Sequence, residues 1–290
     1  MTMAEQKTPL YFNSHEVAKI LQVNVSTIKR WTEEGKLDCV RTHGGHRRFL
    51  MNHLAEFLRA EGRQVEIYPV ETEADLELNY HILKRNYPQL QSAILMRALQ
   101  AERDVIQKVI TGLHLNDIPV HTIYDEILTP VLHEVGHLWS AGELAVAEEH
   151  LASQTIRDAM IRAQGSVQIP QGKNHTALCV NLSGELHDIA LKMVDHVLEA
   201  RGFQIYFSGQ ITPLFKMKQI FRKYHPERLY ISSTFILDAE AAQNELKMLC
   251  DLARSFNTRV FVGGQGFTIL DANHPAIVRQ LKSFADVYES

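Results

Sequence analysis

The stretch HTALCVNLSGELHDIALKMVDHVLEARG, residues 175–202, decides the fold of the C-terminal part of this 290-residue chain. It begins with an apolar run typical of a buried strand, passes through a polar turn and ends with apolar residues at helical spacing. Three further strand candidates alternate with helical segments: FQIYFSG (203–209), RLYISST (228–234) and RVFVGG (259–264). This alternation predicts a doubly wound, flavodoxin-like α/β domain, which we place at residues 174–290.

Ligands of doubly wound domains bind beyond the carboxyl ends of the strands, so the loops there are the candidate site. The first loop carries His187 two residues after Glu185. That spacing suits a metal-binding histidine whose second ring nitrogen is held by an acid. The third strand ends in the hydroxyls of Ser232-Ser233-Thr234. The fourth ends in Gly263-Gly264, which lets a bulky ligand approach the backbone.

These loops resemble the cobalamin-binding fold of methionine synthase and its relatives. In that family an acid-x-His-x-x-Gly loop precedes a Ser-x-Leu/Thr strand end and a later Gly-Gly, and here Ala190 replaces the loop glycine. The resemblance implies that His187 is the lower cobalt ligand. The other matched positions, implied to bind the cofactor, are Glu185, Ser232, Thr234, Gly263 and Gly264.

Residues 8–65 predict a helix-turn-helix module. Ser14 is the expected N-cap of a first helix with an apolar stripe. A second short helix is expected to begin at Ser26, with Ile28 and Trp31 on one face.

A Gly44-Gly45 turn then lies between cationic flanks in RTHGGHRRF, residues 41–49. Such a hairpin suits phosphate contacts while the preceding helix enters the major groove, although a solvated basic hairpin has the same pattern. The order of parts and the THGGHRRF sequence resemble the MerR family of transcriptional regulators. We therefore expect a winged head that binds a double-stranded DNA operator through Thr27, Lys29, Arg30, Arg41, His43, His46, Arg47 and Arg48.

Residues 72–165 contain long amphipathic stretches that predict a bundle of about four helices. One of them carries HEVGH, residues 133–137, the H-E-x-x-H pattern of zinc proteases. The extended protease pattern needs a glycine and a third histidine where Ser140 and Glu143 stand, and Ile156 occupies the position of the glutamate in the other common form. The alternative to a zinc hydrolase is a pair of ordinary bundle histidines.

Trp139 precedes Glu149-His150 by nine intervening residues, and a turn through Gly142 would bring the three side chains together. With a DNA-binding head, a helical segment and an α/β domain in this order, nearly the whole chain resembles the CarH/LitR group of light-responsive repressors. The resemblance implies a regulator rather than an enzyme, in which the bundle caps adenosylcobalamin and Trp139, Glu149 and His150 lie over its upper ligand. It also implies a homo-oligomer, dimer or tetramer, that changes its DNA binding when light breaks the cobalt–carbon bond.

One position departs from that group, because Ser140 stands where a histidine directly follows the motif tryptophan. The upper ligand after photolysis therefore stays open between His137, His150 and water. Three other functions also stay open: a cobalamin sensor that does not use light, a MerR regulator of another ligand, and a cobalamin-dependent methyl-transfer module. No catalytic barrel is recognisable in the sequence, and a DNA-binding head has no place in methyl transfer.

The composition is that of an ordinary globular protein, with 45% hydrophobic and 22% charged residues. No apolar run approaches the roughly 20 residues that span a bilayer, and the first ten residues lack the apolar core of a secretory signal, so we expect a cytoplasmic location without membrane contact. Cys39, Cys179 and Cys250 are far apart and are expected to be small buried hydrophobes. Residues 1–65 hold ten Lys and Arg against seven Asp and Glu, which predicts a polyanionic partner at this end.

Overall fold

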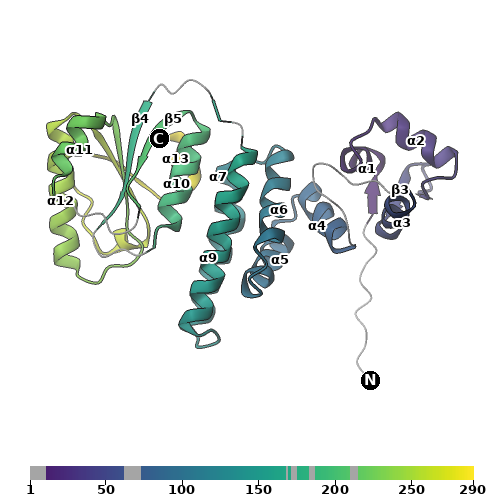
Figure 1. The fold of residues 1–290 in the computed structure, drawn as a ribbon, viewed down its shortest axis with the longest axis horizontal. Helices are drawn as coiled ribbons and strands as arrows, with labels where there is room; N and C mark the ends of the chain where they lie inside the picture. The colour runs from purple at the N-terminus through teal and green to yellow at the C-terminus, as the bar shows by residue number, and fades with distance from the viewer. Residues whose placement is uncertain (1–10, 62–72, 168, 171–174, 183–186, 210–214) are drawn as a thin grey trace. The chain divides into compact units, whose positions relative to one another are not determined.

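The computed structural model describes residues 11–61, 73–167, 169–170, 175–182, 187–209 and 215–290. The chain divides into two compact units (Figure 1). The first contains residues 1–118 and 130–163, and the second contains residues 119–129 and 164–290. The α/β unit therefore includes a segment, 119–129, from the middle of the stretch that we assigned to the helical bundle. None of the helices within the described residues is long and apolar enough to cross a membrane.

The first unit begins with a small head of three helices and an antiparallel sheet. The strands are β1 (Tyr11–Asn13), β2 (Val40–Arg41) and β3 (Arg47–Leu50), in the order β1-β3-β2. The helices are α1 (Ser14–Ile20), α2 (Val25–Glu33) and α3 (Met51–Glu61). Ile28 and Trp31 are buried in the core that these elements share, as their spacing predicts.

The first helix is capped by Asn13, so the prediction of Ser14 as N-cap is wrong by one residue. The Asn13 side-chain oxygen accepts hydrogen bonds from the backbone N–H groups of His15 (2.9 Å) and Glu16 (3.0 Å). The Glu16 carboxylate accepts one from the backbone N–H of Asn13 in return (2.8 Å). This reciprocal capping box needs an acid three residues after the cap, which Asn13 has and Ser14 lacks.

The middle of the chain is helical, with α4 (Glu73–Lys84), α5 (Tyr87–Leu99), α6 (Arg103–Leu115), α8 (Thr129–Ser140) and α9 (Val146–Ala163). Helix α9 packs along α6 and α5, and α4 contacts both α5 and α6. Helix α4 also completes the core of the head. Its Leu76 is buried in that core. The rings of Tyr80 and Phe12 meet edge to face, with 5.4 Å between their centroids. Lys84 forms an ion pair with Glu16.

The second unit is built on a five-stranded parallel sheet in the order β5-β4-β6-β7-β8. Its strands are β4 (His175–Asn181), β5 (Phe203–Phe207), β6 (Arg228–Ser232), β7 (Arg259–Gly263) and β8 (Ile277–Leu281). The order, with the first strand between the second and the third, is the flavodoxin-like order that we predicted. The edge strand β8 was not predicted, because three of its five residues are exposed and it lacks an apolar run.

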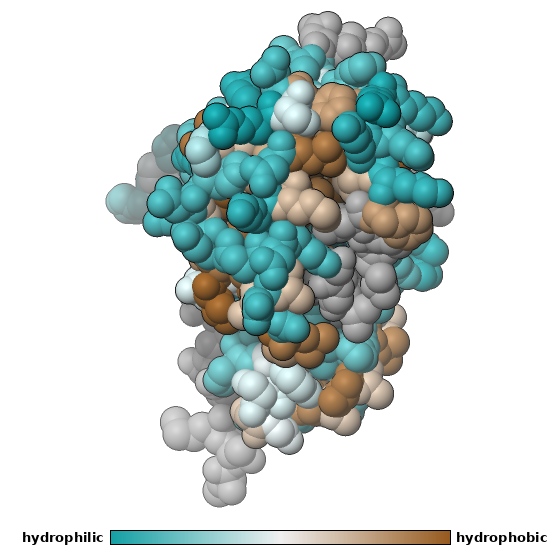
Figure 2. All heavy atoms as spheres, turned by 90° about the vertical axis from the view of Figure 1, so that its left-hand side faces the viewer, coloured by the Kyte–Doolittle hydropathy of each residue, from teal (hydrophilic) through white to brown (hydrophobic). Residues whose placement is uncertain are grey.

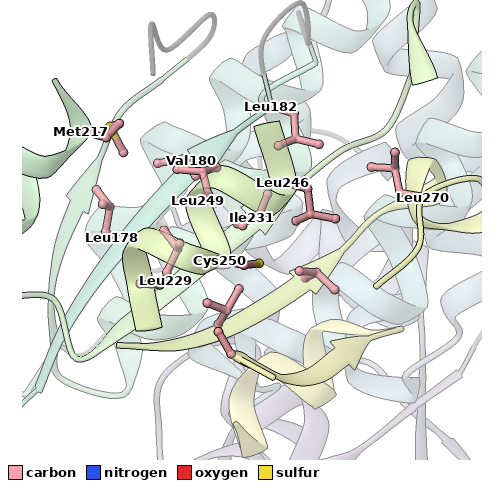
Figure 3. Packing of buried hydrophobic residues seen from close by; sticks show 14 of the residues in the cluster. Leu178, Val180, Leu182, Met217, Leu229, Ile231, Leu246, Leu249, Cys250 and Leu270 are labelled. Carbon is pink, nitrogen blue, oxygen red and sulfur yellow. The ribbon is translucent and has the colours of Figure 1, made fainter. Parts of the chain in front are cut away.

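Helices cover both faces of this sheet (Figure 1). Helices α11 (Met217–Tyr224) and α12 (Ala239–Ser255) lie on one face, and α10 (Ile189–Ala200) and α13 (Phe284–Glu289) lie on the other. Figure 3 shows the core beneath α12, where Leu246, Leu249 and Cys250 meet Val180 and Ile231 from the strands.

Two of the three cysteines are fully buried in the α/β unit, as predicted. Burial raises the pKa of the Cys250 thiol to about 12 and raises that of Cys179 well above its ordinary value. Both side chains therefore stay protonated and act as small apolar groups. Cys39 is half-buried in the head.

The remaining segment of the second unit comprises α7 (Val120–Ile123) and a π-helical turn, η1 (Tyr124–Leu128). It packs against α10 and α13. Two short 3-10 turns, η2 (Gln164–Ser166) and η3 (Gln265–Thr268), follow α9 and β7.

Candidate functional site

The second helix of the head presents its polar residues away from the core. Ile28 and Trp31 face inward, while Lys29 and Arg30 are exposed and Thr27 is half-buried. Arg30 is held only loosely, with its Nε 3.8 Å from the Glu34 carboxylate. The helix therefore exposes a cationic face of the kind that a recognition helix brings to DNA.

The predicted hairpin is present between β2 and β3. Gly45 adopts φ +77°, and the turn is closed by hydrogen bonds from the backbone N–H of Thr42 to the carbonyl of His46 (2.9 Å) and from that of Gly45 to the carbonyl of Thr42 (2.8 Å). Arg41, His43 and His46 are exposed on it. A positive φ at the second glycine explains why this turn carries a Gly-Gly pair.

Arg47 differs from the other cations of the hairpin. Its guanidinium donates to the Glu33 carboxylate of α2 at 3.2 Å, and only 16% of its side chain is exposed. The residue therefore joins the hairpin to the helix, in addition to any contact that it makes with a phosphate. This pairing of residues 14 positions apart leaves no local sequence signal.

A surface hollow of about 350 Å³ lies where the hairpin meets the starts of two helices. Its lining residues are Asn13, Ser14, His15, Val25, His46, Arg47 and Arg48. Among the described residues, no side chain caps the start of α2, so its backbone N–H groups and the cationic side chains together suit a phosphate of the DNA backbone. Sequence reasoning missed the contribution of His15, because only the fold brings the start of α1 beside the hairpin.

The carboxyl ends of three strands meet at one level of the α/β unit. Asn181 of β4 pairs in register with Ser232 of β6, which pairs with Gly263 of β7. His187 follows six residues after Asn181, and its backbone carbonyl accepts a hydrogen bond from the Asn181 side-chain nitrogen at 3.3 Å. The structure thus brings His187, Ser232 and Gly263 to the same edge of the sheet. Glu185 lies outside the described residues.

His187 is an exposed residue at this edge, while its neighbour Asp188 is buried. Helix α10 starts directly after them, and Ala190 lies in its first turn. Alanine is more favourable than glycine within a helix, so the replacement of the family's glycine by Ala190 does not strain the backbone here. A histidine in this position is suited to serve as a nitrogen ligand.

The hydroxyl and glycine positions form a tightly packed junction between two loops. Gly264 has φ +104°, and a Cβ atom on it would lie 2.3 Å from the Ser233 carbonyl oxygen. A Cβ atom on Gly266 would lie 2.5 Å from the Ser233 Oγ. Ser232 and Ser233 are buried, whereas Thr234 is half-buried. The glycines therefore serve first to pack η3 against the end of β6, and Ser233 and Gly266 are members of the junction that the sequence reasoning missed.

Large apolar side chains are exposed in the loops that follow the strands. Phe235 and Leu237 after β6 are 58% and 79% exposed, and Ile269 after β7 is 66% exposed. Figure 2 shows hydrophobic side chains at several places on the drawn face, between stretches that are mostly hydrophilic. Exposed apolar groups at the ligand-binding edge of an α/β sheet suit a large, largely apolar ligand.

The predicted tryptophan motif lies at the turn between α8 and α9, in the first unit. Gly142 has φ +78° in this turn, and its backbone N–H donates to the Trp139 carbonyl at 3.0 Å. Trp139 is 49% exposed. Glu149 accepts a hydrogen bond from the Ser153 hydroxyl at 2.7 Å and lies 3.6 Å from the His150 imidazole, which is exposed. The turn thus holds an exposed aromatic plane and a carboxylate–imidazole pair at the same end of two consecutive helices.

The HEVGH stretch lies on α8, where His133 and His137 are both exposed and Val135 is buried. Across the described residues, no group of three or more His, Cys, Asp or Glu side chains is arranged to hold a metal ion.

Two protein-family models match the chain. A helix-turn-helix domain matches residues 11–62, which contain the head, and a B12 binding domain matches residues 90–163, which contain α6 to α9 and most of α5. Among known proteins, the HTH-type transcriptional repressor CarH of Myxococcus xanthus is 27% identical over 161 residues, or 56% of this chain. The chain spans about half of that repressor, since the match covers 51% of its length.

Other relatives are corrinoid proteins. Dimethylamine corrinoid protein 1 of Methanosarcina acetivorans is 21% identical over 148 residues, which are 49% of this chain and 68% of that protein. The structure of the monomethylamine corrinoid protein of Methanosarcina barkeri superposes with a TM-score of 0.57 at 16% identity, covering 70% of this chain and 96% of that one, which establishes the fold alone. The chain therefore joins a helix-turn-helix domain to a B12 binding domain, and it is similar both to a transcriptional repressor and to corrinoid proteins.

Proposed function

We propose that this chain is a transcriptional repressor, not an enzyme, whose DNA affinity is controlled by bound cobalamin. The observation that carries the proposal is an exposed histidine, His187, at the ligand-binding edge of a flavodoxin-like sheet in a chain that also carries a helix-turn-helix head. A neutral imidazole nitrogen is a suitable ligand for cobalt. The exposed apolar side chains at the same edge suit the broad face of a corrin ring.

In the α/β unit, His187 would bind the cobalt, while Ser232, Thr234, Gly263 and Gly264 would contact the nucleotide tail. In the helical segment, Trp139, Glu149 and His150 would contact the cobalt's other ligand. In the form with an adenosyl group, the cofactor would supply a cobalt–carbon bond that light breaks. Trp139 would exclude water from the upper ligand, and the Glu149–His150 pair would provide polar contacts to it.

The adenosyl form and the use of light are the finer part of the proposal. They rest on the spacing of Trp139 and Glu149-His150 and on the similarity to the CarH repressor. Ser140 cannot replace the histidine of that group as a nitrogen ligand, so a cobalamin sensor that does not use light is the second candidate. Both candidates share the same lower ligand and the same DNA-binding head.

The head would bind double-stranded DNA through the exposed cations of α2 and of the hairpin. A dimer or tetramer would bring several heads to one operator, and such multivalent attachment raises affinity roughly 100-fold or more without new base contacts. Loss of the upper ligand would shift the population between assemblies only if the two assemblies differ in their affinity for that ligand.

A methyl-transfer carrier is the competing proposal, and the corrinoid relatives favour it. The helix-turn-helix head argues against it, because a carrier has no use for a cationic recognition helix. The two functions are separated by DNA binding that depends on the cofactor.

The test uses the full chain purified in the dark with adenosylcobalamin. Absorption spectra, gel-filtration profiles and gel shifts with duplex DNA selected from a random library are recorded before and after green illumination, for the wild type and for His187→Ala. The repressor proposal expects a bound corrin spectrum and DNA binding that changes with the cofactor, and both are lost in the variant. If the absorption spectrum and the DNA affinity do not change on illumination, the sensor is supported. Bound corrin without any DNA binding supports the carrier. The absence of bound corrin overturns all three functions.

A further inference from the structure

An asparagine stands where the first strand of the α/β unit would be expected to remain apolar. Asn181 ends β4 after the buried run from Ala177 to Val180, and its side chain is itself 0% exposed. Asparagine is disfavoured in strands, and burial of an amide is unfavourable unless its hydrogen bonds are satisfied. Stability alone therefore does not explain an amide at this position.

The hydrogen bonds of Asn181 are only partly satisfied. Its side-chain nitrogen donates to the backbone carbonyl of His187 at 3.3 Å, whereas its side-chain oxygen is buried and has no hydrogen-bond partner among the described residues. Thr258, another polar residue buried in this unit, differs because its hydroxyl donates to the Pro226 carbonyl at 2.7 Å. Asn181 thus keeps a costly, half-satisfied amide, and the contact that it makes is to the main chain of the candidate cobalt ligand.

We infer that Asn181 is a positioning residue for His187. Its side chain ties the backbone of His187 to the end of β4. Because Asn181 pairs in register with Ser232, this bond holds His187 at the level of Ser232 along the sheet. The residues that orient a metal ligand change metal affinity by about 10–100-fold when they are removed, although they do not touch the metal. This inference rests on the proposed function, since it assumes that His187 binds cobalt.

The test separates stability from coordination. In Asn181→Leu a side chain of similar shape replaces the amide, so the apoprotein is expected to melt at the same temperature as the wild type or higher. Its affinity for cobalamin is expected to fall by about 10-fold or more. Thr258→Val, at the opposite end of the sheet, removes a satisfied buried hydroxyl and is the matched control: it is expected to lower the melting temperature and leave cobalamin affinity unchanged.

Coordination is read by electron paramagnetic resonance of bound cob(II)alamin in full-length protein labelled with ¹⁵N-histidine. A ¹⁵N ligand splits each line into a doublet, whereas the ¹⁴N of the free cofactor's own base gives a triplet. We expect a doublet for the wild type and for Thr258→Val, and a reduced or absent doublet for Asn181→Leu, with His187→Ala as the reference for complete loss. If Asn181→Leu does not fold, Asn181→Ser is measured instead and the same loss is expected.

The two possible failures are distinct. A wild-type spectrum without a doublet overturns the proposed function, because His187 then does not bind cobalt. If the Asn181 variant shows the same doublet and the same cobalamin affinity as the wild type, only the positioning role is overturned.

Discussion

The phenol of Tyr124 and the imidazole of His196 share a buried hydrogen bond inside the α/β unit, with 2.7 Å between the Tyr124 hydroxyl oxygen and the His196 Nδ1. Tyr124 also meets the edge of the Phe284 ring, 5.5 Å between centroids. Burial, reinforced by Asp195, raises the pKa of Tyr124 far above its ordinary value, so the hydroxyl keeps its proton. The segment 119–129 is therefore anchored to α10 by a buried hydrogen bond and to α13 by a contact between two aromatic rings.

Tyr124→Phe is expected to lower the free energy of unfolding by about 1–3 kcal/mol, because it removes the hydroxyl that the buried imidazole bonds to. Urea denaturation followed by circular dichroism measures the change. Tyr288→Phe is the control, since Tyr288 is 45% exposed and its hydroxyl can bond to water. Equal stability of the Tyr124 variant and the wild type would mean that the hydrogen bond contributes nothing to anchoring.

Asp125 provides a second anchor for the same segment. Its carboxylate accepts the backbone N–H groups of Phe284 (2.8 Å) and Ala285 (2.9 Å), at the start of α13. A carboxylate there satisfies orphan donors and interacts favourably with the helix dipole, so Asp125→Ala is expected to cost about 1–2 kcal/mol of unfolding free energy. Glu126→Ala, an exposed neighbour, is expected to change it by less than about 0.5 kcal/mol. Similar values for the two variants in thermal or urea unfolding would contradict the capping role.

Gly264 tests the packed junction at the candidate ligand edge. Gly264→Ala would place a Cβ atom 2.3 Å from the Ser233 carbonyl oxygen at φ +104°, so we expect a loss of at least about 1–3 kcal/mol from backbone strain alone. Gly136→Ala has the opposite expectation: a Cβ atom on this residue of α8 would meet no neighbouring group within 4 Å, and alanine stabilises a helix by about 0.5–1 kcal/mol. Calorimetry of both variants measures the change in melting temperature. An unchanged melting temperature for Gly264→Ala would show that the loop does not need its present path.

The sequence predicts those parts of the fold that local pattern controls. The four predicted strands are β4, β5, β6 and β7, because each is an apolar run between turn residues. The burial of Ile28 and Trp31 follows from helical spacing in the same way. The contacts that sequence reasoning missed join distant residues: Asp125 with Phe284, Arg47 with Glu33, and Ser233 with Gly266. No local pattern specifies such pairs, because the pairing is decided by tertiary packing.

The candidate site shows the same division. The position of His187 at a strand's carboxyl end follows from the alternation of strands and helices, and the structure agrees. The hydrogen bond from the Asn181 side chain to the His187 main chain was missed, although a polar residue that ends an apolar strand next to a candidate ligand is a signal in the sequence. Helix α4 was assigned to the bundle, but Leu76 and Tyr80 also complete the core of the head, which helical periodicity alone does not reveal.

His114 of α6 makes the stability of the helical segment depend on pH. Burial lowers its pKa from 6.5 to about 4, so the folded state binds fewer protons than the unfolded state between these values. The contribution of neutral His114 to the free energy of unfolding is therefore fully present above pH 6.5. It falls by at most about 3 kcal/mol as the pH decreases toward 4. Urea unfolding at a series of pH values measures this loss. His114→Leu is expected to flatten the curve in this range, whereas His137→Leu, at an exposed position, is expected to leave it unchanged. An unaltered slope in the His114 variant would assign the pH dependence to other groups.

Lys29 and Arg48 test the head as a DNA-binding surface. Lys29 is exposed on α2, and Arg48 lines the hollow beside the starts of α1 and α2. If each contacts one phosphate, Lys29→Ala and Arg48→Ala weaken binding to all duplex sequences alike, because phosphates carry no sequence information. Each also reduces the slope of log affinity against log salt concentration by about 1, since one fewer counterion is released. Fluorescence anisotropy with labelled duplex DNA at several salt concentrations measures both quantities. Lys247→Ala is the control, because it removes an exposed cation on α12 that is far from the head in sequence. It is expected to change neither the DNA affinity nor its salt dependence. A slope that falls equally in all three variants would assign the effect to net charge rather than to contacts made by the head.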